Sequence, residues 1–505
     1  MKYINPFNLS VFFPSLRWLV IFLGLVLLQL PFLTADADHH LSGSRGPFTD
    51  EGLYTAQFRN ATITGHLDLT QMDGIIKEPL FAIGMWLVTH YLVDSMLSCR
   101  GAVIISSAFL LAFLATGFGA FSRTVLIAIP LGFLSFYIFH YSHFAMTEIL
   151  CSLIILAACR LLYFHLSGLS SRWQTLFLSS FLIFIAYACK IQFIYAALIP
   201  SLTIFLAMIF KMSCGIRPER NDWINLIISI FLACIFALIY FMIWILPNYE
   251  FWTSSIFHQV GERTATNIRK VVYNNLLKLI GDIRNWPIFI VLPFALVMAC
   301  QEWWSLTNNK ESRQTWIALV APLLAWLMLE SHKFILPYLP SRYLVSFYIA
   351  LAMLGAAGLS MFKKSHITST WQWFYGVCAI ALILSFTVNI ILYQRAFQER
   401  SYTIVNAQTL FAKDGKWKRK VVMGPWAPTL FWGTGAITLP VWKDYFNDRD
   451  ILTKYHPSAI VSEVDQADSQ GAFTADGIDL RKLTSKVVRV LQWEIHVYEI
   501  PLTTR

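Results

Sequence analysis

The chain has 505 residues, of which 57% are hydrophobic, 15% aromatic and only 13% charged. An average soluble domain carries about 25% charged residues, so this composition excludes an ordinary soluble protein and indicates one that faces lipid. The formal net charge of +10 suits an anionic membrane surface, and we expect no nucleic-acid partner.

The first apolar run covers roughly residues 18–33, after the basic residues Lys2 and Arg17. It is long enough to span a membrane, and no small-residue cleavage site follows it at once. We therefore expect a signal anchor that stays in the protein.

Eleven further apolar runs predict additional membrane spans. They lie near residues 79–97, 101–120, 124–140, 144–166, 175–189, 191–210, 223–246, 286–300, 316–330, 343–361 and 371–393.

Basic residues in short loops set the orientation, because such loops stay on the cytoplasmic side. The loops in question contain Arg160, Arg172, Lys211, Arg217, Arg220, Lys363 and Lys364. All of them can be cytoplasmic only if residues 101–141 make one net crossing, so we expect a broken or re-entrant span there, with Arg123 and Pro130 near the break. This gives eleven effective crossings, with the N-terminus in the cytoplasm and the C-terminus outside.

The sequence therefore predicts an all-α polytopic membrane domain over residues 1–393, with about 11–12 transmembrane helices. Residues 394–505 have more charges and turn residues and contain four strand-like segments, VVMG, AITLPVW, SAIVSEV and VVRVLQWEIHVYEI. The last alternates with a period of two residues, which is typical of a strand. We expect a small extracytoplasmic α/β domain.

The outer loop 34–78 contains the most distinctive motif, FTDEGLYTAQFRN at residues 48–60. An adjacent Asp50–Glu51 pair follows the first span, where the membrane surface keeps carboxylates ionised. The next residues are amphipathic enough to lie along the interface, and the loop closes at Glu78, just before the second predicted span.

This arrangement resembles the GT-C class of polytopic glycosyltransferases, in the branch with the protein O-mannosyltransferases and the lipid A aminoarabinose transferase. In that branch the first outer loop carries an Asp–Glu pair, a Tyr and a Gly, and closes with a Pro-Leu that begins the second span. The matching residues here are Asp50, Glu51, Tyr54, Gly65, Pro79 and Leu80.

Three later segments are similar to family motifs in the same order. HYSHFAMTEILCSLIILA has Glu148 where the family usually has Asp, and His143 where it often has Arg. AYACKIQFIYAALIP has Lys190 between two apolar stretches, and LPSRYLVSFYIALAML has Arg342–Tyr343 at the start of a late span. The resemblance covers most of residues 15–360.

The resemblance implies transfer of a sugar from a polyprenyl-phosphate monosaccharide to a hydroxyl or amine, with inversion, at the extracytoplasmic face of a cytoplasmic membrane. The acceptor would be a lipid, a glycan or a protein. The implied catalytic residues are Asp50 as the base, Glu51 and Glu148. Cations would stabilise the phosphate leaving group. The implied substrate-binding residues are Lys77, Tyr54, Lys190, Arg342, Tyr343 and Arg263.

Each of these residues also has a structural interpretation. Asp50 or Glu51 could cap a helix end or support the loop, and Glu148 could pair with His140 or His143. Lys190 could extend to the interface, Arg342 and Lys77 could anchor span ends, and Arg263 could contact lipid headgroups. The close spacing of Asp36–His40 favours a solvated loop start over a metal site.

Family members can hold a divalent metal, and Glu78 with His258 would supply one oxygen and one nitrogen ligand, although the family's metal site is not reproduced residue for residue. A transporter or lipid flippase is a competing class, but no inverted repeat is visible and the charges gather at one surface. An inactive GT-C-like lipid-binding scaffold is a third interpretation, since fold alone does not fix activity.

Overall fold

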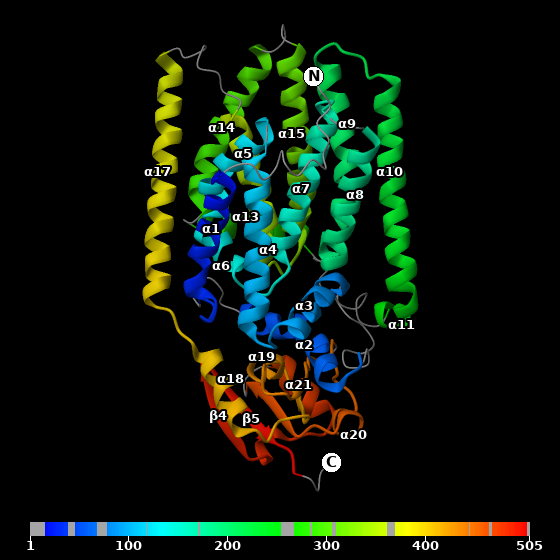
Figure 1. The fold of residues 1–505 in the computed structure, drawn as a ribbon, viewed down its shortest axis with the longest axis vertical. Helices are drawn as coiled ribbons and strands as arrows, with labels where there is room; N and C mark the ends of the chain where they lie inside the picture. Colours follow the sequence, from blue (N-terminus) through cyan, green and yellow to red (C-terminus); the bar gives the residue numbers. More distant parts are fainter. Residues whose placement is uncertain are drawn as a thin grey trace.

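The structure is a computed structural model that describes residues 16–38, 46–67, 78–117, 119–169, 172–253, 267–282, 285–305, 310–360, 369–443, 445–463 and 467–501. Long helices run side by side along the longest axis, and a small domain with a sheet lies at one end of this bundle (Figure 1). We call this end of the bundle the domain end.

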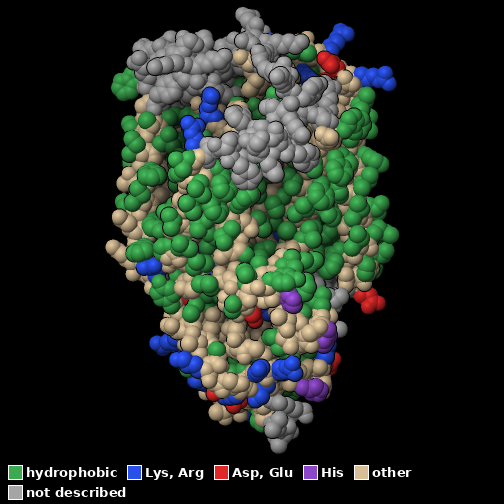
Figure 2. Space-filling model, viewed as in Figure 1, with side chains coloured by type: hydrophobic (Ala, Val, Ile, Leu, Met, Phe, Trp, Pro, Cys, Tyr) green, Lys and Arg blue, Asp and Glu red, His purple; other side chains and the backbone are tan. Residues whose placement is uncertain are grey.

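Apolar side chains explain why the bundle forms. In the described part of the chain, seven helices are long and apolar enough to cross a membrane. They lie within Met96–Thr116, Glu148–Leu166, Ile191–Ser213, Arg220–Asn248, Ser312–Ile335, Ser341–Ser360 and Gly376–Asp414. A bent pair and three shorter apolar helices, Leu16–Phe32, Trp173–Cys189 and Ile288–Val297, accompany them. Hydrophobic side chains cover the middle of the molecule, as a lipid-facing surface requires (Figure 2). The prediction of a polytopic helical membrane protein is confirmed.

The helices of the bundle have the following bounds: α1 Leu16–Gln29, α4 Met96–Thr116, α5 Ala120–Ala128, α6 Phe136–Ser142, α7 Glu148–Leu166, α8 Arg172–Cys189, α9 Ile199–Ser213, α10 Arg220–Tyr240, α14 Trp286–Ser305, α15 Lys310–Glu330, α16 Val345–Ser360 and α17 Ser369–Gln398. Short helical turns follow several of them: η5 Ile191–Leu198, η6 Phe241–Ile245, α11 Tyr249–Phe251, η11 Ser331–Ile335 and η12 Ser341–Leu344. Helix α13 covers Ile268–Gly281.

The predicted span at 79–97 is wrong. Helix α3 covers only Pro79–Tyr91, which is about 20 Å at 1.5 Å per residue and too short to cross. The loop after it returns to the C-terminal domain, where the Asp94 carboxylate accepts a hydrogen bond from the Trp432 indole at 2.9 Å. Helices α2 (Gly46–Thr64) and α3 lie between the bundle and the C-terminal domain (Figure 1).

The predicted break near Pro130 is confirmed. Helices α5 and α6 meet at 91° across the π-helical turn η4, Ile129–Phe133, which has Pro130 in its first turn. The proline lacks an amide hydrogen and cannot continue the helix regularly. Residues 101–141 thus contain most of the full span α4 followed by a broken helix pair, which is the combination that the sequence predicts. The number of net crossings that they make stays a prediction.

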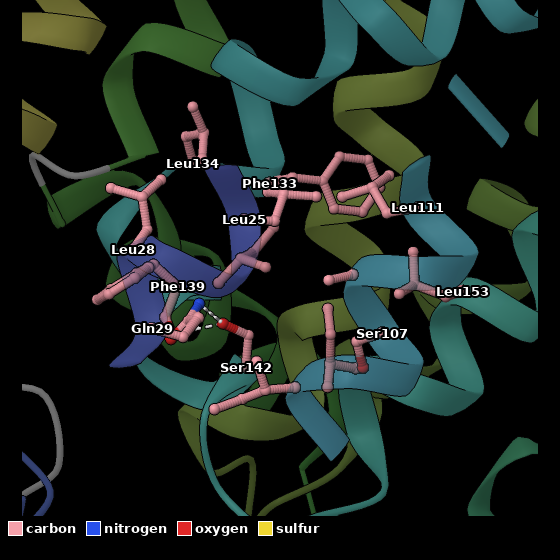
Figure 3. Close-up of a pocket in the computed structure, with 14 residues that line it drawn as sticks. Leu25, Leu28, Gln29, Ser107, Leu111, Phe133, Leu134, Phe139, Ser142 and Leu153 are labelled. Atoms are coloured by element: carbon pink, nitrogen blue, oxygen red, sulfur yellow. Dashed lines mark hydrogen bonds between the residues drawn. The ribbon is translucent and has the colours of Figure 1, made fainter. Parts of the chain in front are cut away.

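A cavity of about 40 Å³ lies beside this bend, and Figure 3 shows its lining by residues of α1, α4, α6, α7 and η4. The lining is mostly apolar, with a hydrogen bond from the Gln29 amide to the Ser142 hydroxyl at one edge. This volume has room for only a few water molecules.

The C-terminal domain contains a five-stranded sheet with strand order β2-β1-β3-β5-β4. Its strands are β1 Val421–Met423, β2 Ile437–Leu439, β3 Ala459–Glu463, β4 Ser485–Val490 and β5 Trp493–Glu499, and its helices are α18 Thr403–Asp414, α19 Ala427–Leu430, α20 Ile451–Tyr455 and α21 Ala467–Ala475. All four predicted strand segments are strands. VVRVLQWEIHVYEI, predicted as one strand, is a hairpin of β4 and β5 that turns at Leu491, which has φ of 51°. The prediction that this domain begins at residue 394 remains a prediction.

Candidate active site

Helix α2 carries the Asp–Glu motif at the domain end. It continues to Thr64, and Gly65 then adopts φ of +82°, a left-handed conformation that ends helices and favours glycine. Adjacent helical residues point about 100° apart, so Asp50 and Glu51 reach different partners. Tyr54 lies one turn after Asp50 on the same face.

Four charged side chains from four segments form an alternating series, which we call the charge ladder: Asp50, Arg342, Glu148 and Lys190. Asp50 Oδ2 lies 2.6 Å from Arg342 Nη2, and Arg342 Nε lies 3.6 Å from Glu148 Oε1. Lys190 Nζ lies 2.8 Å from the same Glu148 oxygen and donates a hydrogen bond to the Tyr54 hydroxyl at 3.1 Å. Four of the predicted site residues therefore meet in one cluster, with Tyr54 against it.

The charge ladder is buried, with between 1% and 7% of each residue exposed. Burial of an ion is costly unless an opposite charge compensates it, and here two carboxylates alternate with two cations. Among the structural interpretations, pairing of Glu148 with a histidine does not occur, because its partners are Lys190 and Arg342. Lys190 does not extend to the interface either, since only 1% of it is exposed.

Two tyrosines surround the cations. Lys190 Nζ lies 4.9 Å from the centre of the Tyr54 ring and 5.6 Å from that of Tyr343. Arg342 Cζ lies 5.2 Å from the Tyr343 ring centre. Aromatic faces attract cations at these distances. Burial raises the pKa of the Tyr54 hydroxyl well above its usual value, although Lys190 opposes this effect. Tyr54 is therefore a neutral hydrogen-bonding group at physiological pH.

Glu51 occupies a separate, fully paired environment. Both of its oxygens accept hydrogen bonds from Arg100 of α4, the shortest at 2.6 Å, and Oε1 also accepts one from the Ala145 backbone amide at 2.6 Å. Arg100 donates further to the carbonyl oxygens of Leu33 and Ala35, in the segment that follows α1. Glu51 and Arg100 thus join α1, α2, α4 and the segment before α7.

A second buried ion pair supports Arg342 and Tyr343. Lys333 Nζ lies 2.7 Å from Glu330 Oε2 and donates to the Tyr343 carbonyl oxygen at 2.8 Å and to the Ser346 hydroxyl at 2.6 Å. Arg100, Glu330 and Lys333 are not among the residues that the sequence motifs predict for the site. The available signal was a charged residue inside or next to an apolar run, which is costly in a membrane and therefore usually paired.

The C-terminal domain binds α2 directly. The Asn60 side chain donates to the Thr438 carbonyl oxygen and accepts from the Thr438 amide, both at 2.9 Å. Because Thr438 lies on the edge strand β2, the Asn60 amide takes the place of a further strand. Arg59 also donates to the Pro428 carbonyl oxygen at 2.6 Å, and its Cζ atom lies 4.1 Å from the centre of the Trp432 ring. These contacts fix the helix that carries Asp50.

Asp36 also contacts the C-terminal domain. Its carboxylate accepts hydrogen bonds from Ser401, from the amide and hydroxyl of Thr403, and from the Ile404 amide. Only 8% of Asp36 is exposed, so the expected solvated loop start is wrong for this residue. It satisfies the free amides at the start of α18.

Three predicted site residues, Lys77, Arg263 and His258, lie outside the described residues. Glu78 is buried immediately before α3. Within the described part of the chain, no three His, Cys, Asp or Glu side chains gather as a metal site would need. The residues that the structure describes thus do not make up a metal site.

Taken together, the apolar bundle, the helices between it and the small sheet domain, and the buried charges at the domain end define a polytopic membrane protein with a charged site at one end of its bundle.

Comparison with solved structures identifies the neighbours of this fold. ArnT from Cupriavidus metallidurans bound to undecaprenyl phosphate superposes with a TM-score of 0.59 at 13% identity, over 95% of this chain and 98% of that chain. ArnT in the apo state superposes with a TM-score of 0.58 at 13% identity, over 95% of this chain and 97% of that chain. An oligosaccharyltransferase from Archaeoglobus fulgidus, tethered with an acceptor peptide, superposes with a TM-score of 0.50 at 12% identity. The match covers 97% of this chain and 75% of that chain.

These neighbours are GT-C glycosyltransferases, so the resemblance seen in the sequence is confirmed as a likeness of fold. No family model and no curated protein sequence matches the chain.

Proposed function

We propose that this protein is an integral membrane glycosyltransferase. It moves a sugar from a polyprenyl-phosphate monosaccharide to an acceptor hydroxyl or amine, with inversion, at the extracytoplasmic face. The observation that carries this proposal is the buried charge ladder at the domain end of an apolar bundle, with Asp50 held 2.6 Å from Arg342. A carboxylate beside fixed cations is what sugar transfer from a lipid phosphate requires.

The proposed reaction is a single displacement. The acceptor oxygen or nitrogen bonds to the anomeric carbon and gives its proton to Asp50, the base. The bond between the anomeric carbon and the phosphate oxygen breaks on the opposite face, which inverts the centre, and the phosphate oxygen keeps the electron pair. Arg342 and Lys190 stabilise the negative charge that develops there.

The charge ladder holds these two cations ready in the protein without substrate. Glu148 contacts both of them, so its proposed role is to fix their spacing. Arg342 Nε makes no hydrogen bond within the described part of the chain, which leaves it a donor for a phosphate oxygen. Tyr54 and Tyr343 orient Lys190.

Glu51 has a different role in this proposal. Its carboxylate is fully engaged by Arg100 and the Ala145 amide, so we assign it to positioning α2 and thereby Asp50. Lys77 and Arg263 remain proposed phosphate contacts, and Glu78 with His258 a proposed metal-binding pair.

The neighbours' ligands support the donor class. One neighbour binds undecaprenyl phosphate and another is tethered to an acceptor peptide. The acceptor of this chain is accordingly a lipid, a glycan or a protein. The basic residues Lys211, Arg217 and Arg220 lie in and beside the loop between α9 and α10, at the opposite end of the bundle (Figure 1). This supports a cytoplasmic location for that end and an extracytoplasmic C-terminal domain, in the cytoplasmic membrane.

The test uses purified protein in nanodiscs with a panel of polyprenyl-phosphate monosaccharides and a membrane extract as the source of acceptor. Release of bare polyprenyl phosphate is followed by mass spectrometry. Asp50→Asn should lower the rate about 10³-fold, which is typical for loss of a general base. Asp222→Asn is the matched control, because that carboxylate pairs with Lys211 at the opposite end. Full activity in Asp50→Asn would refute the mechanism.

A further inference from the structure

We propose that Tyr187, Tyr240, Trp244 and Trp252, which we call the aromatic cluster, form the subsite that binds the sugar ring of the polyprenyl-phosphate sugar. The inference rests on the proposed function and adds to it the site of sugar recognition.

The aromatic cluster lies next to the charge ladder. Tyr187 is three residues before Lys190 at the end of α8, and its ring centre is 5.6 Å from that of Tyr240 near the end of α10. Trp244 follows Tyr240 by one turn. Trp252 packs against Trp244 and against Ile191, the neighbour of Lys190 in the chain.

The polar atoms of this cluster have no partners among the described residues. The hydroxyls of Tyr187 and Tyr240 and the indole nitrogens of Trp244 and Trp252 are buried and make no hydrogen bond there. Buried Tyr hydroxyls and Trp indoles usually find an acceptor, because leaving one unsatisfied costs free energy. Four such donors in neighbouring side chains indicate that a ligand supplies the acceptors.

A sugar ring has the complementary chemistry. Its hydroxyl and ring oxygens accept hydrogen bonds, and its C–H faces pack against aromatic rings. Tyrosine and tryptophan offer a flat apolar surface and one polar group each. The Glu78 carboxylate is close enough to Tyr240 and to Lys190 to interact with both electrostatically. It can accept a hydrogen bond from a sugar hydroxyl or pair with a sugar amine.

A membrane-interface belt of aromatic residues does not explain this cluster. Belt residues extend outward to the headgroups, as the exposed side chains of Trp173 (63%) and Tyr249 (54%) do. Three of the four members are buried instead, with 1% of Tyr187, 3% of Tyr240 and 7% of Trp252 exposed, and Trp244 is partly buried.

The experiment measures binding in nanodiscs by native mass spectrometry. The probes are undecaprenyl phosphate and undecaprenyl phosphate carrying glucose, mannose or 4-amino-4-deoxyarabinose. Wild-type protein should bind at least one sugar-bearing lipid about tenfold more tightly than the bare lipid phosphate. Tyr187→Phe and Tyr240→Phe should each weaken binding of that sugar-bearing lipid about fivefold, the effect of one lost hydrogen bond, and leave the bare lipid phosphate unaffected.

Tyr163→Phe is the matched control, since this buried tyrosine packs against Phe121 at the end of α7 away from the charge ladder. Without lipid, Tyr187→Phe and Tyr240→Phe should unfold at the same or a higher temperature than wild type, because each removes an unpartnered buried hydroxyl. A merely structural role predicts a lower temperature.

The outcomes separate this inference from the proposed function. If wild type binds bare undecaprenyl phosphate but prefers none of the sugar-bearing lipids, or if the Phe variants keep the full preference, the subsite is refuted and the proposed function stands. If wild type binds no polyprenyl phosphate at all, both are refuted.

Discussion

Replacement of Glu51 by Gln tests whether Glu51 positions α2 while Asp50 carries the chemistry. Glu51 accepts three hydrogen bonds from Arg100, between 2.6 and 3.2 Å, and a fourth from the Ala145 amide. A glutamine retains one acceptor oxygen, presents an NH₂ group to other donors, and leaves the Arg100 charge buried without its counter-ion. Breaking a buried ion pair in this way costs about 3–5 kcal/mol.

The predicted result is a loss of stability with chemistry retained. A loss of about 3 kcal/mol should lower the midpoint of thermal unfolding by about 5 °C or more. Unfolding can be followed with a thiol-reactive dye, because Cys99, Cys151, Cys159 and Cys189 are free and buried. Below its unfolding temperature the variant should keep a measurable part of the transfer rate.

The control for this experiment is Glu250→Gln, which neutralises an exposed carboxylate and should leave the midpoint unchanged. If Glu51→Gln is as stable as wild type while transfer is abolished, Glu51 takes part in the chemistry and its assignment as a positioning residue is wrong.

Three further predictions concern the geometry of the site. Gly46→Ala would place a Cβ 2.3 Å from Arg342 Nη1 and displace the guanidinium from Asp50, so the transfer rate should fall about 10²-fold. The control is Gly84→Ala, which should not change the transfer rate because no atom lies within 4 Å of the added Cβ. Arg342→Lys removes the planar guanidinium that matches a phosphate. The transfer rate should fall about 10²-fold, and the affinity for bare lipid phosphate should fall only about tenfold. Equal losses of rate and affinity would argue against a role of Arg342 in the transition state. Asn60→Ala leaves the Thr438 amide and carbonyl unsatisfied, at a cost of about 2–4 kcal/mol, so limited proteolysis should cut the C-terminal domain faster than in wild type.

The sequence predicted the parts of the fold that follow from local pattern. Apolar runs located most of the membrane helices, Pro130 marked the break, and alternation located the strands. The prediction of a span at residues 79–97 is wrong because α3 is as apolar as a span but too short to be one. Its length is decided by the loop that returns to Trp432, a contact between residues 338 positions apart.

The sequence predicted the four members of the charge ladder but not which of them pair. The order of motifs selected Asp50, Glu148, Lys190 and Arg342, which the structure brings together. Glu51 is separated from these residues because it pairs with Arg100 of α4. Helix α2 is held in place by the contact between Asn60 and the C-terminal domain. Such long-range contacts leave no periodic pattern in the sequence.

Native mass spectrometry of gently released wild type and Asp50→Asn tests the central claim most directly. The account predicts that a polyprenyl phosphate co-purifies with the protein, and that Asp50→Asn is enriched in the form that still carries one sugar, because it binds the lipid without completing transfer. Absence of every polyprenyl phosphate species from both proteins, with no binding when sugar-bearing lipids are added, would contradict it.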